Sequence, residues 1–315
     1  MLITLQACLP ALAYEQRVAI LFGFKNYEQG QGKGIFRNLP FTANDLESVG
    51  TALREIGFDP INIHIYSDID APKGTKFEYR KINSNRSQLE ETISKALESL
   101  QSDEQQHRDS LLLIYFTGHG GIFNNSKRML AFPDTKVNNE TSYASVWSIL
   151  EQLSSNAGNV DKMLVIDACA DYLGKGVPYA SALTPEEMAV YLFSSSLGEM
   201  SFFDRQLGIS VFTHYFVEAI KQADDVTFGV GNGDGKVNSE EIEKYVREYV
   251  PNHPRKEQKK SKSEAKSSAQ HPSGSGGKKI ELGSSSIVSS KLPDISGESA
   301  ESRKARLSGY LRAIY

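Results

Sequence analysis

Three runs of almost uninterrupted apolar residues constrain the fold of this chain more than any other feature: residues 17–23, 110–116 and 162–166. Runs of this length without alternation are typical of strands that are buried on both faces. Such strands occur in parallel sheets covered by helices on both sides, because a parallel connection needs a long crossover. We therefore expect an α/β fold with a mostly parallel sheet between two layers of helices.

The segments between these runs have the apolar periodicity of helices. Helices are expected from Thr42 and from Ser87, each of which has an acidic residue three positions later and resembles a capping box, and through residues 146–153 and 212–220. Further strands are expected at residues 61–65, 129–132, 189–193 and 278–282. The order of elements is that of repeated β-α-β units.

Length and composition leave room for one large α/β domain or two smaller ones in 315 residues. The hydrophobic content of 39% and charged content of 23% are typical of a globular protein and not of a disordered one. A net charge of -4 gives no reason to expect a nucleic-acid partner. The two cysteines, Cys8 and Cys169, exclude a disulfide framework and a Cys-rich zinc site.

Residues 1–13 are mostly apolar and end in a small-x-small pattern before Tyr14, which predicts an export signal within residues 1–16 and a periplasmic or secreted protein. The segment carries no Lys or Arg before its apolar run. An N-terminal strand and a cytoplasmic location therefore stay open as the alternative. No other run approaches the ~20 apolar residues that a membrane span needs.

Two chemically useful residues, His119 and Cys169, follow two of the predicted buried strands. The carboxyl ends of parallel strands lie at one edge of a sheet, where sites in such folds are found. A thiol beside an imidazole makes a nucleophile with its general base, and the amides of Gly120 and Cys169 would suit an oxyanion hole. Taken singly, a residue such as Cys169 is more often a buried apolar residue than a nucleophile, and one such as His119 is more often an ordinary loop histidine.

The residues around this pair resemble the caspase-like cysteine peptidases, which include caspases, metacaspases and bacterial relatives. Residues 115–120 resemble the motif Tyr-x-Ser-Gly-His-Gly, and residues 165–169 resemble the Asp-x-Cys motif; residues 17–23, 39–45 and 132–134 add to the likeness. The resemblance implies a caspase-like three-layer sandwich with a mostly parallel six-stranded sheet. It also implies a thiol protease, a hydrolase of protein or peptide substrates with no required cofactor, and leaves the oligomeric state open.

The resemblance also suggests substrate-binding residues. In metacaspase-like members the Asp two residues before the nucleophile selects Arg or Lys, and Asp167 has that position here. Asp45 could supply a second carboxylate, and Thr117 stands where the family has Ser. The simpler alternatives are a strand-end hydrogen-bond acceptor for Asp167 and a first-turn helix charge for Asp45. Residues 170–172 depart from the family, which keeps a catalytically inactive scaffold open as the alternative function.

A loop at residues 230–241 resembles an EF-hand, with Asn232, Asp234, Gly235 and Glu241 at positions three, five, six and twelve. Position one is Val230, which has no ligand atom in its side chain. A tight turn before a helix is therefore the simpler interpretation, and calcium binding is the alternative. The family resemblance adds Asp171 as another calcium candidate.

The peptidase domain is expected over residues 17–283, with a flexible insertion at 251–277 and a tail at 284–315 that includes a short helix near 302–314. The insertion has a basic run at 255–266, interpreted as a solvated linker. If the enzyme cleaves after basic residues, this run and Lys127–Arg128 are candidate self-cleavage sites. His214, within a predicted amphipathic helix, is expected to be structural.

Overall fold

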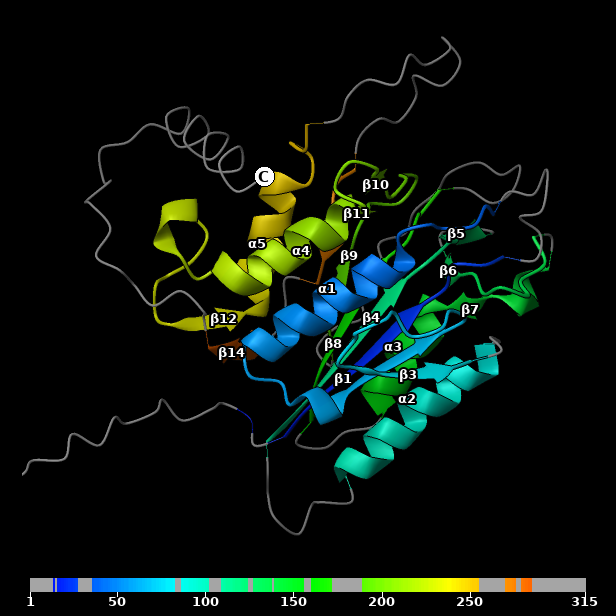
Figure 1. Cartoon of the computed structure of the whole chain (residues 1–315), viewed down its shortest axis with the longest axis horizontal. Coiled ribbons are helices and arrows are strands. Elements are labelled where there is room, and N and C mark those ends of the chain that lie inside the picture. Colours follow the sequence, from blue (N-terminus) through cyan, green and yellow to red (C-terminus); the bar gives the residue numbers. More distant parts are fainter. Residues whose placement is uncertain are drawn as a thin grey trace, which may run out of the picture.

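The computed structural model of the chain describes residue 14 and residues 16–27, 36–82, 86–101, 109–123, 127–137, 139–155, 160–171, 189–254, 270–275 and 279–284 (Figure 1). Its centre is a seven-stranded sheet in the order β13-β9-β8-β4-β1-β2-β3. Only β13 runs antiparallel to its neighbour. The strands are β1 (Gln16–Gly23), β2 (Ile63–Ser67), β3 (Glu78–Lys81), β4 (Ser110–Thr117), β8 (Val160–Asp167), β9 (Val190–Phe193) and β13 (Ser273–Gly274).

The three apolar runs form the middle of this sheet. All eight residues of β4 are buried, and β1 and β8, which pair with it on either side, are buried over nearly their whole length. A strand covered on both faces has no solvent side that would select polar residues, which explains the missing alternation. The prediction of a mostly parallel sheet is confirmed.

Helices cover both faces of the sheet (Figure 1). One face carries α1 (Thr42–Glu55), α4 (Val211–Gln222) and α5 (Ser239–Tyr249), and the other carries α2 (Arg86–Gln101) and α3 (Val146–Ser155). Each face has its own apolar core: Leu21 and Leu113 point toward α1 and α4, whereas Ile20 and Leu112 point toward α2 and α3. This alternation of direction along β1 and β4 builds the three-layer sandwich.

The sheet has seven strands and not six, and its edges differ from the prediction. The edge strand β3 is largely exposed and lacks the apolar signal of a strand. The opposite edge is β13, whereas the predicted strand at 278–282 is β14 (Glu281–Ser284) and pairs with β12 (Lys236–Asn238). Short edge strands are defined by backbone pairing with a neighbour, which a local pattern does not reveal.

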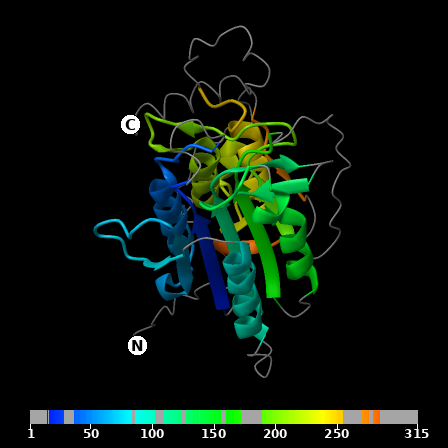
Figure 2. The same cartoon turned by 90° about the vertical axis from the view of Figure 1, so that its right-hand side faces the viewer.

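A second, antiparallel sheet follows β4 and comprises β5 (Gly120–Phe123), β6 (Lys127–Leu130) and β7 (Ala144–Ser145). It lies beyond one end of the parallel strands (Figures 1 and 2). The predicted strand at 129–132 belongs to this sheet and not to the central one. The remaining elements are the strands β10 (Phe203–Asp204) and β11 (Ile209–Ser210) and the 3-10 helices η2 (Pro60–Asn62), η4 (Glu140–Ser142) and η5 (Val226–Phe228).

The predicted capping box at Thr42 is wrong. The residue before α1 is Phe41, and the Thr42 hydroxyl donates to the carbonyls of Phe24 and Leu39. Asp45 is therefore free of a capping role, and its carboxylate reaches other elements. No helix in the described part of the chain has the length and apolar character of a membrane span.

Candidate active site

The register of the sheet brings His119 and Cys169 to the same edge. Thr117, the last residue of β4, pairs with Asp167, the last residue of β8. The amide of Gly118 continues the contact by donating to the carbonyl of Asp167 at 3.2 Å. His119 and Cys169 therefore follow neighbouring strands at equivalent positions, as the order of elements predicts.

His119 is held firmly by three residues that come earlier in the chain. Its Nε2 lies 2.7 Å from the carbonyl oxygen of Arg37, and its amide donates to the Tyr27 hydroxyl at 2.9 Å. The imidazole packs edge-on against the Tyr27 ring, with centroids 4.7 Å apart, and against the Phe36 ring at 4.9 Å. These contacts restrict both the position and the rotation of the ring.

The contact with Arg37 also determines which nitrogen of His119 carries the proton. A carbonyl oxygen can only accept, so Nε2 must be the donor. The neutral ring then has its lone pair on Nδ1. Burial lowers the pKa of His119, although the Arg37 carbonyl opposes this shift. The imidazole is therefore neutral at pH 7 and able to accept a proton at Nδ1.

The Cys169 thiol rests in its protonated form and not as a thiolate. Burial raises the pKa of its thiol to about 11, and the charges of Asp167 and Asp171 act in the same direction. The Ser201 amide donates to Sγ at 3.3 Å and partly opposes this shift. The thiol proton is directed to the Ser201 carbonyl at 3.6 Å, a weak contact for a sulfur donor.

The two candidate catalytic side chains thus hold separate partners, and among the described residues no hydrogen bond joins them. The backbones of Gly120 and Cys169 nevertheless approach each other closely. A Cβ on Gly120 would come within 2.9 Å of the carbonyl oxygen of Cys169, so this position requires glycine. Gly120 therefore lets the chain after β4, which carries His119, approach the chain after β8, which carries Cys169.

Asp45 lies against the end of β4 and the start of α4, and 2% of it is exposed. Its Oδ1 accepts from the Ser210 amide at 2.9 Å, and its Oδ2 accepts from the hydroxyls of Ser210 at 2.7 Å and Thr117 at 3.0 Å. The carboxylate therefore connects α1 and β4 with β11, directly before α4. This is more than a first-turn helix charge, and Thr117 acts as a donor to it.

Asp167 is equally buried, at 3% exposed. Its Oδ1 accepts from the Ser201 hydroxyl and its Oδ2 from the Thr213 hydroxyl, both at 2.6 Å. Thr213 Oγ1 also lies 2.5 Å from the Tyr115 hydroxyl. Ser201 thus touches both Asp167 and Cys169, which connects the two features that the Asp-x-Cys motif places side by side.

The two aspartates have no balancing cation among the described residues. Within the described residues, no Lys, Arg or His forms an ion pair with either carboxylate. Burial and the neighbouring Asp167 charge raise the pKa of Asp45 to about 7, and burial also raises the pKa of Asp167. A positively charged group placed beside these two buried carboxyl groups would stabilise their ionised forms.

Several residues of this site gave no signal in the sequence. Arg37 acts through its backbone, and Ser201, Ser210 and Thr213 are small polar residues of a common type. The one usable signal is Thr213, a polar residue among the apolar positions of the α4 helix. His214, its neighbour, is buried, and burial lowers its pKa to about 4, which agrees with the structural role expected.

Arg128 contradicts one predicted self-cleavage site. It lies in β6 and is 7% exposed, donating to the Ser195 carbonyl at 2.6 Å and stacking over the Phe193 ring at 4.5 Å. A bond beside a buried side chain within a strand is inaccessible to a protease in this conformation. The other candidate, the basic run at 255–266, lies outside the described residues.

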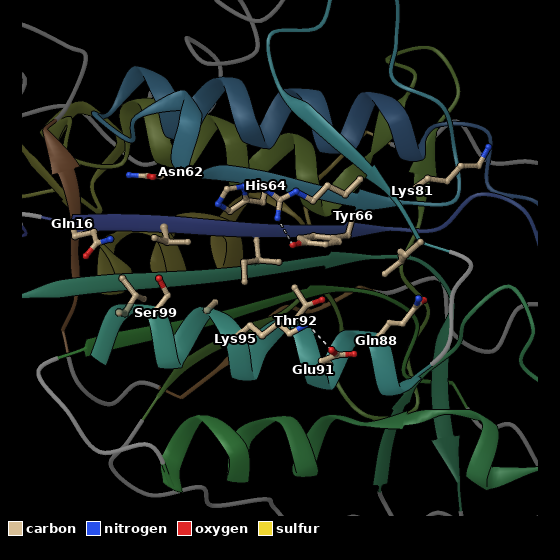
Figure 3. Close-up of a pocket in the computed structure, with 16 residues that line it drawn as sticks. Gln16, Asn62, His64, Tyr66, Lys81, Gln88, Glu91, Thr92, Lys95 and Ser99 are labelled. Carbon is tan, nitrogen blue, oxygen red and sulfur yellow. Dashed lines mark hydrogen bonds and ion pairs between the residues drawn. The ribbon is translucent and has the colours of Figure 1, made fainter. Parts of the chain in front are cut away.

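A groove of about 480 Å³ lies between α2 and the strands β1, β2 and β3 (Figure 3). Figure 3 shows His64 and Tyr66 pointing into it from β2, opposite Thr92 and Lys95 of α2. None of the predicted site residues lines it. The groove is therefore separate from the edge that carries His119 and Cys169.

The comparisons with known proteins agree with the fold. Residues 16–272 match the family model of the caspase domain. The chain belongs to this family. A similar solved structure is that of caspase-1 from Spodoptera frugiperda, with a TM-score of 0.53 and 15% sequence identity, covering 83% of this chain and 89% of that one. The search of curated proteins finds no match.

This membership confirms the caspase-like fold and supports a general role as a cysteine peptidase. At 15% identity, the likeness to caspase-1 shows the fold alone. The caspase domain matched at residues 16–272 reaches into the predicted insertion, and residues 1–13 and 285–315 lie outside the described residues.

Proposed function

We propose that this caspase-domain protein is a cysteine endopeptidase in which Cys169 is the nucleophile and His119 the general base and acid. The observation that carries the proposal is the hydrogen bond from His119 Nε2 to the Arg37 carbonyl. It assigns the proton to Nε2 and leaves Nδ1 to accept, at the sheet edge that also carries Cys169.

In the proposed reaction, Cys169 Sγ attacks the peptide carbonyl carbon while its proton passes to His119 Nδ1. The amides of Gly120 and Cys169 would stabilise the negative oxygen of the tetrahedral intermediate. The C–N bond then breaks, and Nδ1 returns the proton to the leaving amine. Water attacks the thioester with His119 as base, the acid product leaves, and the thiol regains its proton.

The proton transfer is an essential part of this proposal because both groups rest in their neutral forms. The pKa of Cys169 is raised to about 11 and that of His119 is lowered, so a preformed thiolate–imidazolium pair is disfavoured. Rotation of the Cys169 side chain would exchange the weak contact with the Ser201 carbonyl for one with His119. Substrate binding would favour that rotation by filling the site.

We further propose that the enzyme cleaves after Arg or Lys. Asp167 and Asp45 place two buried carboxylates beside the cysteine loop, without a partner cation among the described residues. A basic side chain would be attracted by both charges, and an acidic one repelled. Met200 and Phe203, 42% and 40% exposed, lie one residue before and two residues after Ser201 and would offer apolar contact to neighbouring substrate residues.

Cleavage of matched fluorogenic peptides that end in Arg, Lys or Asp tests this function. The proposal predicts hydrolysis of the Arg and Lys peptides by the wild type, none by Cys169→Ala, and at least a 100-fold lower kcat/KM for the Asp peptide, because about 3 kcal/mol separates attraction from repulsion at such a site. Faster cleavage of the Asp peptide would contradict the specificity. Equal rates for wild type and Cys169→Ala would favour the inactive scaffold.

A further inference from the structure

The loop between α4 and α5 holds a buried acid that the proposed peptidase reaction does not use. Asp224 follows the C-terminal end of α4 and is 4% exposed. Its Oδ2 accepts from the Gly235 amide at 3.0 Å. Its Oδ1 is buried and has no hydrogen-bond partner among the described residues. An unpartnered buried carboxylate oxygen is costly unless a cation balances it.

Asp224 lies where the EF-hand-like loop lacks a ligand. In the loop numbering, Gly235 is position six, the glycine of the sharp turn, and its amide contacts Asp224 instead of a residue at position one. The amide of Gly233 also donates to the Asp224 carbonyl at 3.0 Å. An acid that follows the C-terminal end of α4 thus approaches the loop at the point where Val230 has no ligand atom in its side chain.

Gly231 makes this approach possible. A Cβ at this position would come within 2.2 Å of the Ala223 carbonyl oxygen and of the Asp224 carbonyl carbon. The loop therefore lies directly on the end of α4, backbone against backbone. Any other residue would separate Asp224 from the loop.

The other acidic and amide groups of the loop face the same region. The amide of Asn232 donates to Glu241 Oε1 at 3.3 Å, and the Asn232 side chain contacts Asp234 at 3.0 Å. The charges of Asp224 and Asp234 both act on Glu241. The nearest lysine of the loop, Lys236, forms its ion pair with Glu281 at 2.9 Å, outside this cluster.

We infer that this loop binds a calcium ion, and that Asp224 supplies the carboxylate ligand that Val230, at position one, cannot supply. Asn232, Asp234 and Glu241 would supply further oxygen atoms, and the Lys236 carbonyl corresponds to position seven. Within the described part of the chain, no three acidic, His or Cys side chains are already grouped as a metal centre. The ion would therefore depend on amide and backbone oxygens and on closure of the loop around it, as hard cations with flexible coordination allow.

Such a site predicts modest affinity, with a dissociation constant between about 10⁻⁵ and 10⁻³ M, since one ligand comes from outside the loop and closure is needed. Binding would connect the end of α4 to the start of α5. Ligand that binds only the folded state raises the melting temperature, by about 5 °C at a hundredfold excess over the dissociation constant.

Calorimetric titration of the full chain with calcium chloride, with thermal melting in parallel, tests the inference. Wild type should bind one ion and melt higher. Asp224→Asn, which retains an acceptor for the Gly235 amide, should fold but bind at least tenfold more weakly. The matched control is Glu240→Gln, which removes an exposed charge of α5 that pairs with Lys244 and should leave binding unchanged.

Three results would overturn the inference: no binding by the wild type up to about 10 mM calcium, well above the expected range; binding by Asp224→Asn within twofold of the wild type; or an equal loss in Glu240→Gln. The last result would indicate general charge attraction and not a site. Melting of Asp224→Asn without calcium separates a folding defect from a binding defect. These readouts do not depend on peptidase activity.

Discussion

His119 and Cys169 follow neighbouring strands at equivalent positions, yet the structure treats them differently. His119 is fixed by the Arg37 carbonyl and packed between two aromatic rings. Cys169 has only weak sulfur contacts with Ser201, and burial keeps its thiol protonated. The base is already neutral and held in position, whereas the nucleophile is protonated and only weakly held. Activity should therefore depend on transfer of the thiol proton.

The largest effect should come from removing the imidazole of His119. His119→Ala is expected to lower kcat for an Arg peptide by about 10³-fold, because the variant loses the group that accepts the thiol proton. His64→Asn, in the groove away from the site, should leave kcat unchanged. Steady-state kinetics measure both. Near-wild-type turnover by His119→Ala would show that the fixed imidazole is not the base.

Asp167→Asn should have the next largest effect. Loss of one buried charge is expected to lower kcat/KM for an Arg peptide by about 100-fold, since the substrate cation then lacks its partner. Asp45→Asn, further from the Asp-x-Cys motif, should cost about tenfold. Matched peptides with a neutral residue in place of Arg give the control. An equal loss for Arg and neutral peptides would indicate a positioning role instead.

The buried acids also predict how stability depends on pH. The pKa of Asp45 is raised from 3.8 to about 7, so the folded protein binds this proton more tightly than the unfolded chain. The stabilisation of the folded state by this bound proton is fully present below pH 4 and is lost as pH rises toward 7. We expect the unfolding free energy to fall by about 2 kcal/mol between about pH 5 and 7 from this group.

Urea denaturation of wild type and Asp45→Asn across this range checks that expectation. The difference between the two proteins isolates Asp45 from the other titrating groups, and the slope should be smaller in the variant. A wild-type stability that rises with pH in parallel with that of the variant would show that Asp45 ionises normally.

The Cys169 thiol itself is tested by its reactivity toward an alkylating reagent. Because the pKa of Cys169 is raised to about 11, alkylation by iodoacetamide should accelerate about tenfold per pH unit between about pH 7 and 10, without a plateau near the ordinary thiol value. Mass spectrometry of the peptide that contains Cys169 follows the reaction. A plateau at acidic pH would show a preformed thiolate and would remove the contrast between the two residues.

The difference between His119 and Cys169 also shows how much the sequence can predict. The apolar runs locate β4 and β8, and strand order places His119 and Cys169 together, because these properties depend on local pattern and general topology. The Arg37 carbonyl lies 82 residues from His119, and its role depends on backbone position alone.

Asp224 and Thr42 illustrate the same limit in other regions. The EF-hand pattern allows for ligands within twelve residues, so Asp224, which lies six residues before its first position, is missed by that pattern. The capping-box pattern at Thr42 is local, but the Thr42 hydroxyl finds carbonyls of an earlier loop instead. Contacts that lie outside the local sequence pattern decided each case, and such contacts need the folded structure.

The most direct test of the central claim is active-site labelling with a peptidyl-Arg chloromethyl ketone, followed by mass spectrometry. The reagent needs a basic-residue site, a nucleophile and a nearby imidazole at once. We predict stoichiometric modification at Cys169 in the wild type, slow modification in His119→Ala, and none in Cys169→Ala. An unmodified wild-type protein, or equal labelling of wild type and His119→Ala, would contradict the proposed pairing of Cys169 with His119.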